Sequence, residues 1–263
     1  MTKEKETNGS AWSFEQKKFL LKQLIKRDFK SRYKRTALGI LWSMLSPLLF
    51  FTAQALVFSY FLDRGEHYIS YLITGNIVYH YFTDGTHHTM SALQSNSGII
   101  AKIKVDKDIF LYSKSITCLI NFFLTMIIMF IVVAVDQTAF HWKFFLLAYP
   151  IVCLFFMILG VGYLLSALFV FFKDTQYLYG LFTRVLLYFS AIYYRVERFP
   201  EHLQMLFYFN PVYCYIDYFR TIIIYNAIPS LLVHGLCIGF AVLFMLIGKL
   251  VYKLNDQKFI YYF

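Results

Sequence analysis

The side chains best suited to chemistry gather in one short stretch of an apolar sequence, between residues 80 and 88. The stretch contains three histidines, one aspartate and two threonines: His80, Thr83, Asp84, Thr86, His87 and His88. At about 100° per residue along a helix, His80, Asp84 and His87 fall within a narrow arc. Ionisable residues within a membrane helix usually face a bundle interior or a wet cavity and mark a pathway.

Four interpretations of this cluster are open. It can hold a metal ion, take part in proton-coupled transport, form a polar wall toward a substrate or second subunit, or satisfy its own hydrogen bonds inside a bundle. No second cluster completes a metal-ligand shell, so we predict no metal site and favour the polar wall. The four cysteines are far apart with no paired spacing, which predicts neither a disulfide framework nor a metal centre.

Aromatic residues, 21% of the chain, supply a second candidate lining. An aromatic ring packs against the apolar face of a pyranose, while a tyrosine hydroxyl bonds to sugar hydroxyls. Tyr79, Phe82 and Tyr193 are therefore candidates to line a passage. Asp84 and His87 of the polar cluster are candidates for the same lining. Aromatic belts at the membrane surface are the commoner use of such residues.

Motifs for nucleotide binding and hydrolysis are missing from the sequence. Its Gly248-Lys249 pair is followed by Leu250 and lacks the upstream glycine of a Walker A loop. Neither a Gly-x-Ser-x-Gly elbow nor a His-Glu-x-x-His pair occurs. We expect no enzyme and no cofactor on this chain, so any ATP-driven work requires ATP bound to another chain.

The elements that must position these residues are membrane helices. Charged residues are 15% and hydrophobic residues 59% of the 263-residue chain, against about 25% charged residues in soluble domains. A spanning helix needs about 20 apolar residues. The sequence predicts an all-α integral membrane protein with six spans: Leu38–Leu62, Tyr68–Leu93, Phe110–Val135, Phe144–Phe172, Leu178–Tyr194 and Leu231–Tyr252. The fifth, which is the shortest, holds Arg184, the only base deep in a predicted span.

The distribution of basic residues predicts the topology. A dense basic run ends at Arg35, and no charge follows Thr36 until Asp63. Basic residues that flank a span mark the cytoplasmic side, and most of the 25 lysines and arginines fall on that side. We expect both termini in the cytoplasm, a cytoplasmic segment over residues 1–36 and one transmembrane domain over residues 37–263. No cleavable signal peptide is predicted.

A helix is predicted within the amino-terminal segment. Ser13 and Gln16 have the spacing of a capping box. Apolar residues such as Leu24 occupy about half of the following helix, and lysines such as Lys26 lie opposite. This pattern is typical of a helix in the membrane interface, attracted to anionic headgroups. The alternative is a helix packed on another cytoplasmic protein.

Residues 194–229 are semi-apolar and interrupted by prolines, so we predict a broken or re-entrant helical hairpin on the outer side, at about residues 200–228. Asn210 as cap and Pro211 at the first helical position begin its second helix. Asp217 and Arg220 lie three residues apart and can pair. In the last predicted span, Gly235 and Gly239 are compatible with close helix packing.

The start of the first predicted span carries a recognisable motif. Arg27-Asp28-x-Lys30-x-Arg32-Tyr33, followed by Leu38-Gly39-x-Leu41-Trp42-x-x-Leu45-x-Pro47, resembles type-2 ABC exporter permeases. The resemblance is closest to permeases for O-antigen, capsule and teichoic-acid polymers. Most of the chain takes part, through Tyr68-Ile69-x-Tyr71-Leu72-x-x-Gly75, Asn96-x-Gly98-Ile99-Ile100-x-Lys102, Phe172-Lys173-Asp174 and Asn210-Pro211-x-x-x-x-Ile216-x-x-x-Arg220.

Two positions depart from the family pattern. Ala191-Ile192-Tyr193-Tyr194 stands where relatives often have Ser/Thr-Pro-Ile-x-Tyr, which puts the local backbone bend in doubt. Val105-Asp106 stands where an aromatic-proline pair is common.

The resemblance implies a homodimer of six-span subunits in the bacterial cytoplasmic membrane. Two separate ATPase subunits would bind ATP and Mg below it. The substrate implied is a polysaccharide linked to a lipid, typically undecaprenyl, moved outward along a path between protomers. Membrane lipids are expected partners and nucleic acid is not.

The resemblance also implies three sets of site residues. Those expected to touch the ATPase are Phe14, Ile99, Ile100, Lys102, Lys104, Asp106, Lys173 and Asp174. Those that would meet the lipid pyrophosphate, or headgroups in general, are Arg27, Lys30, Arg32, Lys34 and Arg35. Those expected to close the outer mouth are Pro200, Asn210, Pro211, Asp217 and Arg220.

Three competing functions remain open at this point. A membrane transferase that uses the cluster on the second span would be active without an ATPase and would fail on alanine substitution of Asp84 or His87. A lipid-binding scaffold would show no nucleotide-dependent change. A type-2 exporter of small molecules usually has a larger extracellular region or a different motif at its first span.

Overall fold

The computed structural model describes residues 12–34, 39, 41–61, 66–103, 105–138, 141–256 and 258–259. Within these ranges the regular secondary structure is entirely helical. The α-helices are α1 Phe14–Tyr33, α2 Leu41–Phe61, α3 Tyr68–Met90, α4 Ala92–Ser95, α5 Ser97–Ile100, α6 Asp108–Val135, α7 Ala148–Phe171, α8 Thr175–Phe189, α9 Glu201–Phe207, α10 Pro211–Ile223 and α11 Leu231–Asn255. Two short 3-10 helices, η1 Trp142–Leu147 and η2 Val196–Arg198, precede α7 and α9.

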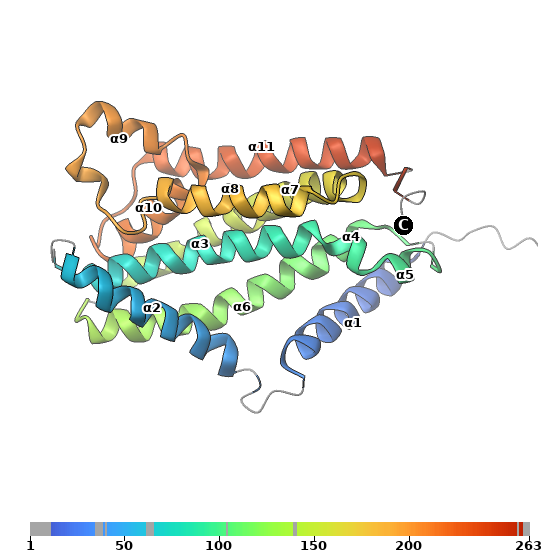
Figure 1. Ribbon diagram of the computed structural model, residues 1–263, viewed down its shortest axis with the longest axis horizontal. Coiled ribbons are helices and arrows are strands. Elements are labelled where there is room, and N and C mark those ends of the chain that lie inside the picture. Colours follow the sequence, from blue (N-terminus) through green and yellow to red (C-terminus); the bar gives the residue numbers. More distant parts are fainter. Residues whose placement is uncertain are drawn as a thin grey trace, which may run out of the picture.

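The long helices run along the longest axis of the molecule (Figure 1). One end carries α1, α4, α5 and the carboxyl-terminal residues, and we call it the α1 end. The opposite end carries α9 and the carboxyl end of α2, and we call it the α9 end. Every predicted span coincides with a helix, namely α2, α3, α6, η1 with α7, α8 and α11.

Three helical stretches among the described residues are long and apolar enough to cross a membrane: Asp108–Val135, Trp142–Phe171 and Leu231–Asn255. A shorter apolar stretch, Leu45–Phe58, lies within α2. The other helices that coincide with predicted spans are more polar or shorter. Helix α8 has 15 residues, which at 1.5 Å per residue gives about 22 Å, less than the ~30 Å hydrocarbon core.

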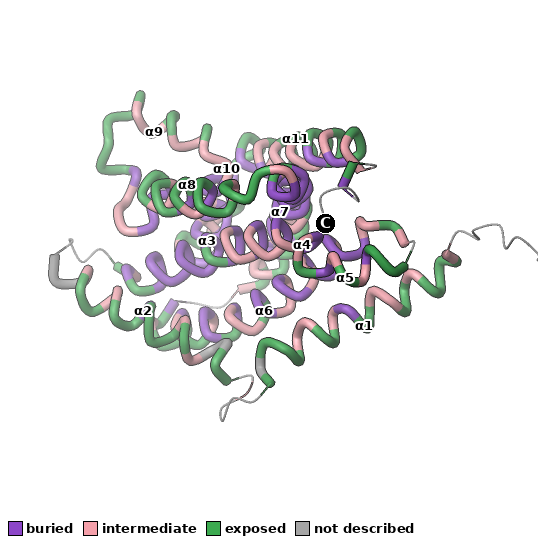
Figure 2. Tube along the Cα trace, turned by 45° about the vertical axis from the view of Figure 1, so that its right-hand side comes forward, coloured by how far each residue is buried: buried purple, intermediate pink, exposed green. Residues whose placement is uncertain are grey.

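The core forms around α3 and α7, two long helices that are buried along most of their length (Figure 2). Helices α7 and α11 touch backbone to backbone. A Cβ on Gly248 would lie 2.0 Å from the Gly160 carbonyl oxygen, and one on Gly160 would lie 2.4 Å from the Met245 nitrogen. Only glycine permits such an approach.

Close helix packing in this span was predicted at Gly235 and Gly239, but the described residues pack closely at another glycine. A Cβ on Gly235 or Gly239 would meet no described atom within 4 Å. The contact lies three turns further along α11, at Gly248, because α7 presents its own glycine there.

The outer segment contains two helices, as the prolines predicted. Helix α10 begins at Pro211, and the Asn210 side chain accepts a hydrogen bond from the Val212 amide at 3.0 Å. The predicted cap is therefore confirmed. Unlike α9, which buries no residue fully, α10 is buried along most of its length. It is thus part of the packed core.

Candidate functional site

Helix α1 packs obliquely against the α1 end of the bundle (Figure 1). The capping box is present: the Gln16 amide bonds to the Ser13 hydroxyl at 3.3 Å, and the Ser13 amide bonds to the Gln16 side chain at 2.9 Å. Leu24 is buried in a cluster that contains Phe110 of α6. Phe14, at the start of the helix, is 78% exposed. Part of the apolar face of this predicted amphipathic helix therefore packs against the chain's own bundle.

Polar contacts hold α1 along its length. Lys17 pairs with Asp106 in the loop before α6. Arg27 donates to the Asn96 side-chain oxygen at 2.7 Å. Asp28 lies 2.9 Å from the Lys114 ammonium on α6. These contacts tie α1 to three separate segments of the bundle.

The last charged contact of α1 reaches the polar cluster of α3. Arg32 donates to Asp84 at 3.0 Å, and the same guanidinium nitrogen lies 3.3 Å from His88 Nε2. Both side chains of the Arg32–Asp84 pair are about one-third exposed, at 35% and 36%. Lys30 and Lys34 of the same run are exposed, and Arg35 lies outside the described residues.

The polar cluster of α3 divides between two sides of the helix. Asp84 and His88 meet Arg32, whereas the His87 ring packs against Tyr179 of α8 with 5.0 Å between centroids. Tyr179 also donates to the Thr86 hydroxyl at 2.7 Å. Among the described residues no group of three or more side chains is arranged to hold a metal ion. The cluster is thus divided between two interaction sites, and the one at Arg32 borders a cavity.

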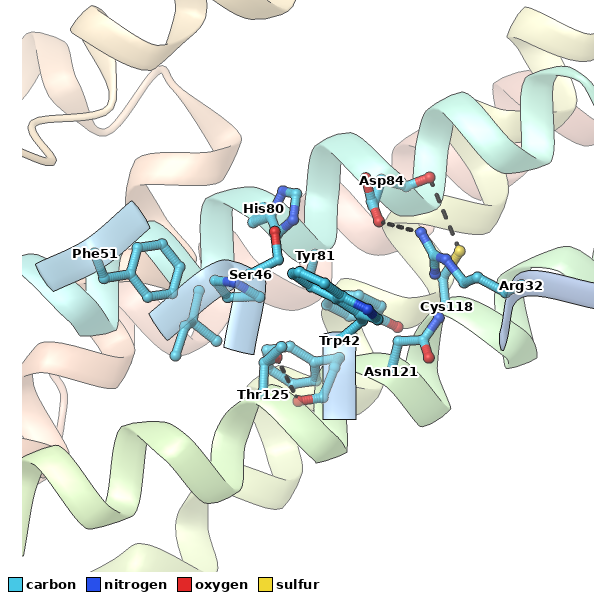
Figure 3. Close-up of a pocket in the computed structure, with 13 residues that line it drawn as sticks. Arg32, Trp42, Ser46, Phe51, His80, Tyr81, Asp84, Cys118, Asn121 and Thr125 are labelled. Carbon is cyan, nitrogen blue, oxygen red and sulfur yellow. Dashed lines mark hydrogen bonds and ion pairs between the residues drawn. The ribbon is translucent and has the colours of Figure 1, made fainter. Parts of the chain in front are cut away.

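That cavity, of about 280 Å³, lies between α2, α3 and α6. Figure 3 shows Arg32 and Asp84 facing each other at one end, Trp42 and Tyr81 in the middle, and Phe51 at the other end. Cys118 and Asn121 of α6 line the charged end. We call this space the α2 cavity.

A second cavity of about 390 Å³ lies on the other side of α2, toward α8. Tyr79 and Tyr193, both predicted to line a passage, border it. Tyr79 donates to the Thr183 carbonyl of α8, and Tyr193 accepts a hydrogen bond from Gln54 of α2 at 2.9 Å. Phe82 is buried at 5% exposure. Within this chain the two tyrosines connect α3 to α8 and α2 to the segment after α8.

The segment predicted to meet an ATPase forms two short helices, α4 and α5, followed by a loop. Lys102 and Asp106 are exposed, Ile99 is half-buried and Ile100 is buried. Lys104 lies outside the described residues. The exposed Lys173-Asp174 turn is adjacent, because Lys173 donates to the Gln94 side chain of α4.

Sequence reasoning missed the contact that braces this loop. Lys107 donates to the carboxylate and to the carbonyl of Asp256, each at 2.7 Å, just after α11. Phe259 is fully buried against Tyr252 and Phe171. The available sequence signal for this fold-back was the aromatic run that begins at Phe259, directly after the polar residues 255–258.

At the α9 end, Arg220 of α10 is 2% exposed. It donates to the Tyr71 carbonyl at 3.2 Å, the Ala191 carbonyl at 2.9 Å and the Ile192 carbonyl at 3.1 Å. Its guanidinium carbon lies 3.4 Å from the centre of the Tyr71 ring, in cation–π contact. A fork of five donors matches several carbonyls at once, which a lysine cannot do.

The predicted pairing of Asp217 with Arg220 is wrong. Asp217 instead accepts a hydrogen bond from Tyr208 at 3.3 Å. Arg220 instead faces the Tyr71 carbonyl of α3 and the carbonyls of Ala191 and Ile192 after α8. Of the other residues predicted at the outer mouth, Pro200 is exposed, and Asn210 donates to the Ser190 hydroxyl at 3.0 Å.

The backbone bend after α8 is present although the family's proline is not. Helix α8 ends at Phe189, and Ala191 adopts φ +48°. This left-handed conformation is uncommon for a residue with a Cβ. Arg220 binds the carbonyls of Ala191 and of the next residue, so the bend is stabilised by tertiary contacts.

Comparison with known proteins assigns the chain to a family. Residues 20–224 match the model of the ABC-2 type transporter family. The chain belongs to this family. The match runs from within α1 to the residue after α10, so it includes both arginine sites and every helix between them. The permease is a multi-pass membrane protein.

Three curated relatives of this ABC-2 permease illustrate the similarity. An O-antigen export system permease protein RfbA from Klebsiella pneumoniae is 26% identical over 198 residues, which cover 73% of this chain and 75% of the relative. A protein of the same name from Myxococcus xanthus is 25% identical over 161 residues, 60% of this chain and 62% of the relative. The polysialic acid transport protein KpsM from Escherichia coli is 21% identical over 252 residues, 93% of this chain and 96% of the relative.

Proposed function

We propose that this chain is the transmembrane subunit of an ATP-driven exporter that moves lipid-linked cell-surface polysaccharide outward across the bacterial cytoplasmic membrane. The observation that carries the proposal is the family match together with the relatives, whose names all refer to export or transport of such polymers. Within this class the substrate is of the O-antigen, capsule or teichoic-acid type.

The membrane topology proposed has six spans with both termini in the cytoplasm. The three long apolar helices support it, as does the concentration of basic residues on α1. The short helix α8 would need neighbouring protein or tilted lipid to complete its crossing. The pair α9 and α10 would form the outer hairpin, between about residues 200 and 228, and would close the outer mouth.

The ATPase would dock at the α1 end. Exposed Phe14, Lys102 and Asp106 lie on α1 and the loop after α5, and Lys173 lies beside α4. Because Lys17 of α1 is paired with Asp106, movement of the loop would pull on α1. ATP and Mg would be held by that partner.

A second copy of this chain would complete the translocation path. Helix α8 exposes large apolar side chains on several turns, including Leu181, Val185 and Phe189, and Arg184 is exposed among them. A base facing lipid in a span is costly, which favours a protein partner or a wet path on this face. The tyrosines behind it would support that wall.

Co-purification tests the proposal. The chain is expressed with the ATPase encoded beside it, purified through a tag on this chain, and assayed for ATP hydrolysis. Lys102→Glu, at the exposed loop, should release the ATPase or lower its hydrolysis. Lys143→Glu makes the same charge change at the α9 end and serves as the matched control, which should leave both unchanged.

A chain that binds no ATPase in nanodiscs, yet turns over a lipid-linked sugar, would replace this proposal with the transferase. Loss of that turnover in Asp84→Ala would then identify the polar cluster as its centre. Equal effects of the two lysine variants would instead remove the docking site from the loop after α5.

A further inference from the structure

The α2 cavity changes character along its length. Figure 3 places Arg32 and Asp84 at one end, Ser46 and His80 between, and Phe51 at the other end. At the charged end Arg32 of α1 meets Asp84 of α3, and from there the lining continues between α2 and α3 to Phe51. Such a space suits a molecule with a charged head and a hydrocarbon chain.

The second cavity extends the apolar part. The two cavities share lining residues Ser46, Pro47, Phe51 and His80, so they meet beneath α2. From there the second cavity reaches Leu187 of α8. Together they provide room for several chain carbons beyond the head group.

The charges at the charged end are balanced, and their partners can be exchanged. A small adjoining cavity is lined by Asp28, Arg32, His88 and Lys114. Arg32 and Lys114 thus face the carboxylates of Asp84 and Asp28. His80 and His88 line the same two cavities. Asp84 competes for Arg32 with any anion that enters, because an arginine fork binds carboxylate and phosphate in the same geometry.

We propose that the α2 cavity binds the phosphate head of a lipid, with Arg32 exchanging Asp84 for the phosphate and the lipid chain lying beneath α2. The inference rests on the proposed function and deepens it, since it assigns the lipid end of the substrate to one cavity of one protomer. Two sources share this chemistry: a polyprenyl phosphate and an ordinary anionic phospholipid. Competition from Asp84 keeps binding reversible, as a carrier that must leave again requires.

This assignment separates Arg32 from the rest of the basic run. Lys30 and Lys34 do not line the α2 cavity, and Arg27 is occupied by Asp28 and Asn96. Headgroup attraction by the run as a whole would depend on total charge. Binding in the cavity depends on Arg32, which lines it.

Native mass spectrometry of the purified full chain in detergent tests the proposal. The probes are undecaprenyl phosphate, phosphatidylglycerol, phosphatidylcholine and inorganic phosphate, each titrated separately. The variants are Arg32→Gln, Asp84→Asn and the control Lys26→Gln, which removes the same charge from an exposed position on α1.

Arg32→Gln should weaken binding of the preferred phosphate lipid about ten-fold, the effect of one charged hydrogen bond. Asp84→Asn should strengthen it, and Lys26→Gln should leave it unchanged. Preference for undecaprenyl phosphate identifies the carrier as the ligand. Equal affinity for phosphatidylglycerol identifies a general anionic lipid site.

Equal losses in Arg32→Gln and Lys26→Gln, or weaker binding in Asp84→Asn, would overturn the proposal. If inorganic phosphate binds as tightly as the lipids, the apolar end of the cavity contributes nothing to binding. If phosphatidylcholine binds more tightly than the anionic lipids, the charged end does not select the ligand. This measurement needs no ATPase. If the chain binds its ATPase but Arg32→Gln leaves lipid binding unchanged, this inference fails while the proposed function stands.

Discussion

Arg32 and Arg220 stand at opposite ends of the molecule and are held in opposite ways. Arg32 is about one-third exposed and meets a carboxylate and a histidine. Arg220 is 2% exposed and meets three backbone carbonyls and an aromatic ring. The first set of partners can be exchanged for a ligand or for water. The second fixes the relative positions of α3, α10 and the turn after α8.

The energetic difference follows from burial. An exposed ion pair is worth about 0–1 kcal/mol, because water solvates both groups when they separate. Removing one partner of a buried set leaves the other polar groups without hydrogen bonds and removes about 1–3 kcal/mol for each. The α1 end is therefore suited to movement, and the α9 end to rigidity.

Substitution of Arg220 should have the largest effect. Arg220→Met retains much of the volume and removes the donors to three buried carbonyls, so we expect a loss of about 3–5 kcal/mol in the free energy of unfolding. Unfolding in mixed micelles, followed by circular dichroism, measures it. Arg184→Met, the same change at an exposed arginine of α8, is the control and should change stability little. Equal losses of stability in the two variants would show that the buried Arg220 stabilises the fold no more than an exposed arginine does.

Gly75→Ala tests the same site from the other side. A Cβ there would lie 2.6 Å from an Arg220 guanidinium nitrogen. Because carbonyls fix that guanidinium, it cannot yield easily, and we expect a loss of about 1–3 kcal/mol from overpacking. Gly235→Ala, where no described atom lies within 4 Å, should instead be neutral or stabilising by up to about 1 kcal/mol. Equal midpoints in the two variants would show that Arg220 adapts.

The helices of both ends could be predicted from local sequence. Ser13 with Gln16, and Asn210 with Pro211, predict where α1 and α10 begin from at most four residues of sequence. Continuous apolar runs predict the long helices. Caps and hydrophobic runs act over one or two turns, so a single sequence contains them.

The contacts that define the two arginine sites could not be predicted in the same way. Asp217 was chosen as the partner of Arg220 because it lies one turn away, yet the true acceptors come from segments 28 to 149 positions distant. Backbone carbonyls carry no sequence signal, so nothing marked them. Asp84 was recognised as a polar residue in a span, but its partner Arg32 lies on a helix whose position against the bundle depends on tertiary packing.

The ion pair of Asp28 with Lys114 is intermediate between the two arginine sites. Their side chains are 10% and 17% exposed. Lys114→Met should therefore lower the free energy of unfolding by about 1 kcal/mol, between the values for exposed and buried sites. A double-mutant cycle with Asp28→Asn, read from the same unfolding curves, isolates the interaction. A coupling as large as the Arg220 effect would show that the α1 end is as rigid as the α9 end.

Arg32→Gln should have the smallest effect on stability, less than about 1 kcal/mol, because its pair with Asp84 is exposed to water. The same change should nevertheless increase hydrogen exchange at the carboxyl-terminal turns of α1, since the Arg32–Asp84 contact ties that end of α1 to α3. Exchange at α10 should not change, because Arg220 holds that helix independently. Faster exchange at both ends would mean that the two arginines belong to one cooperative unit, and that the α1 end cannot move without loosening α10.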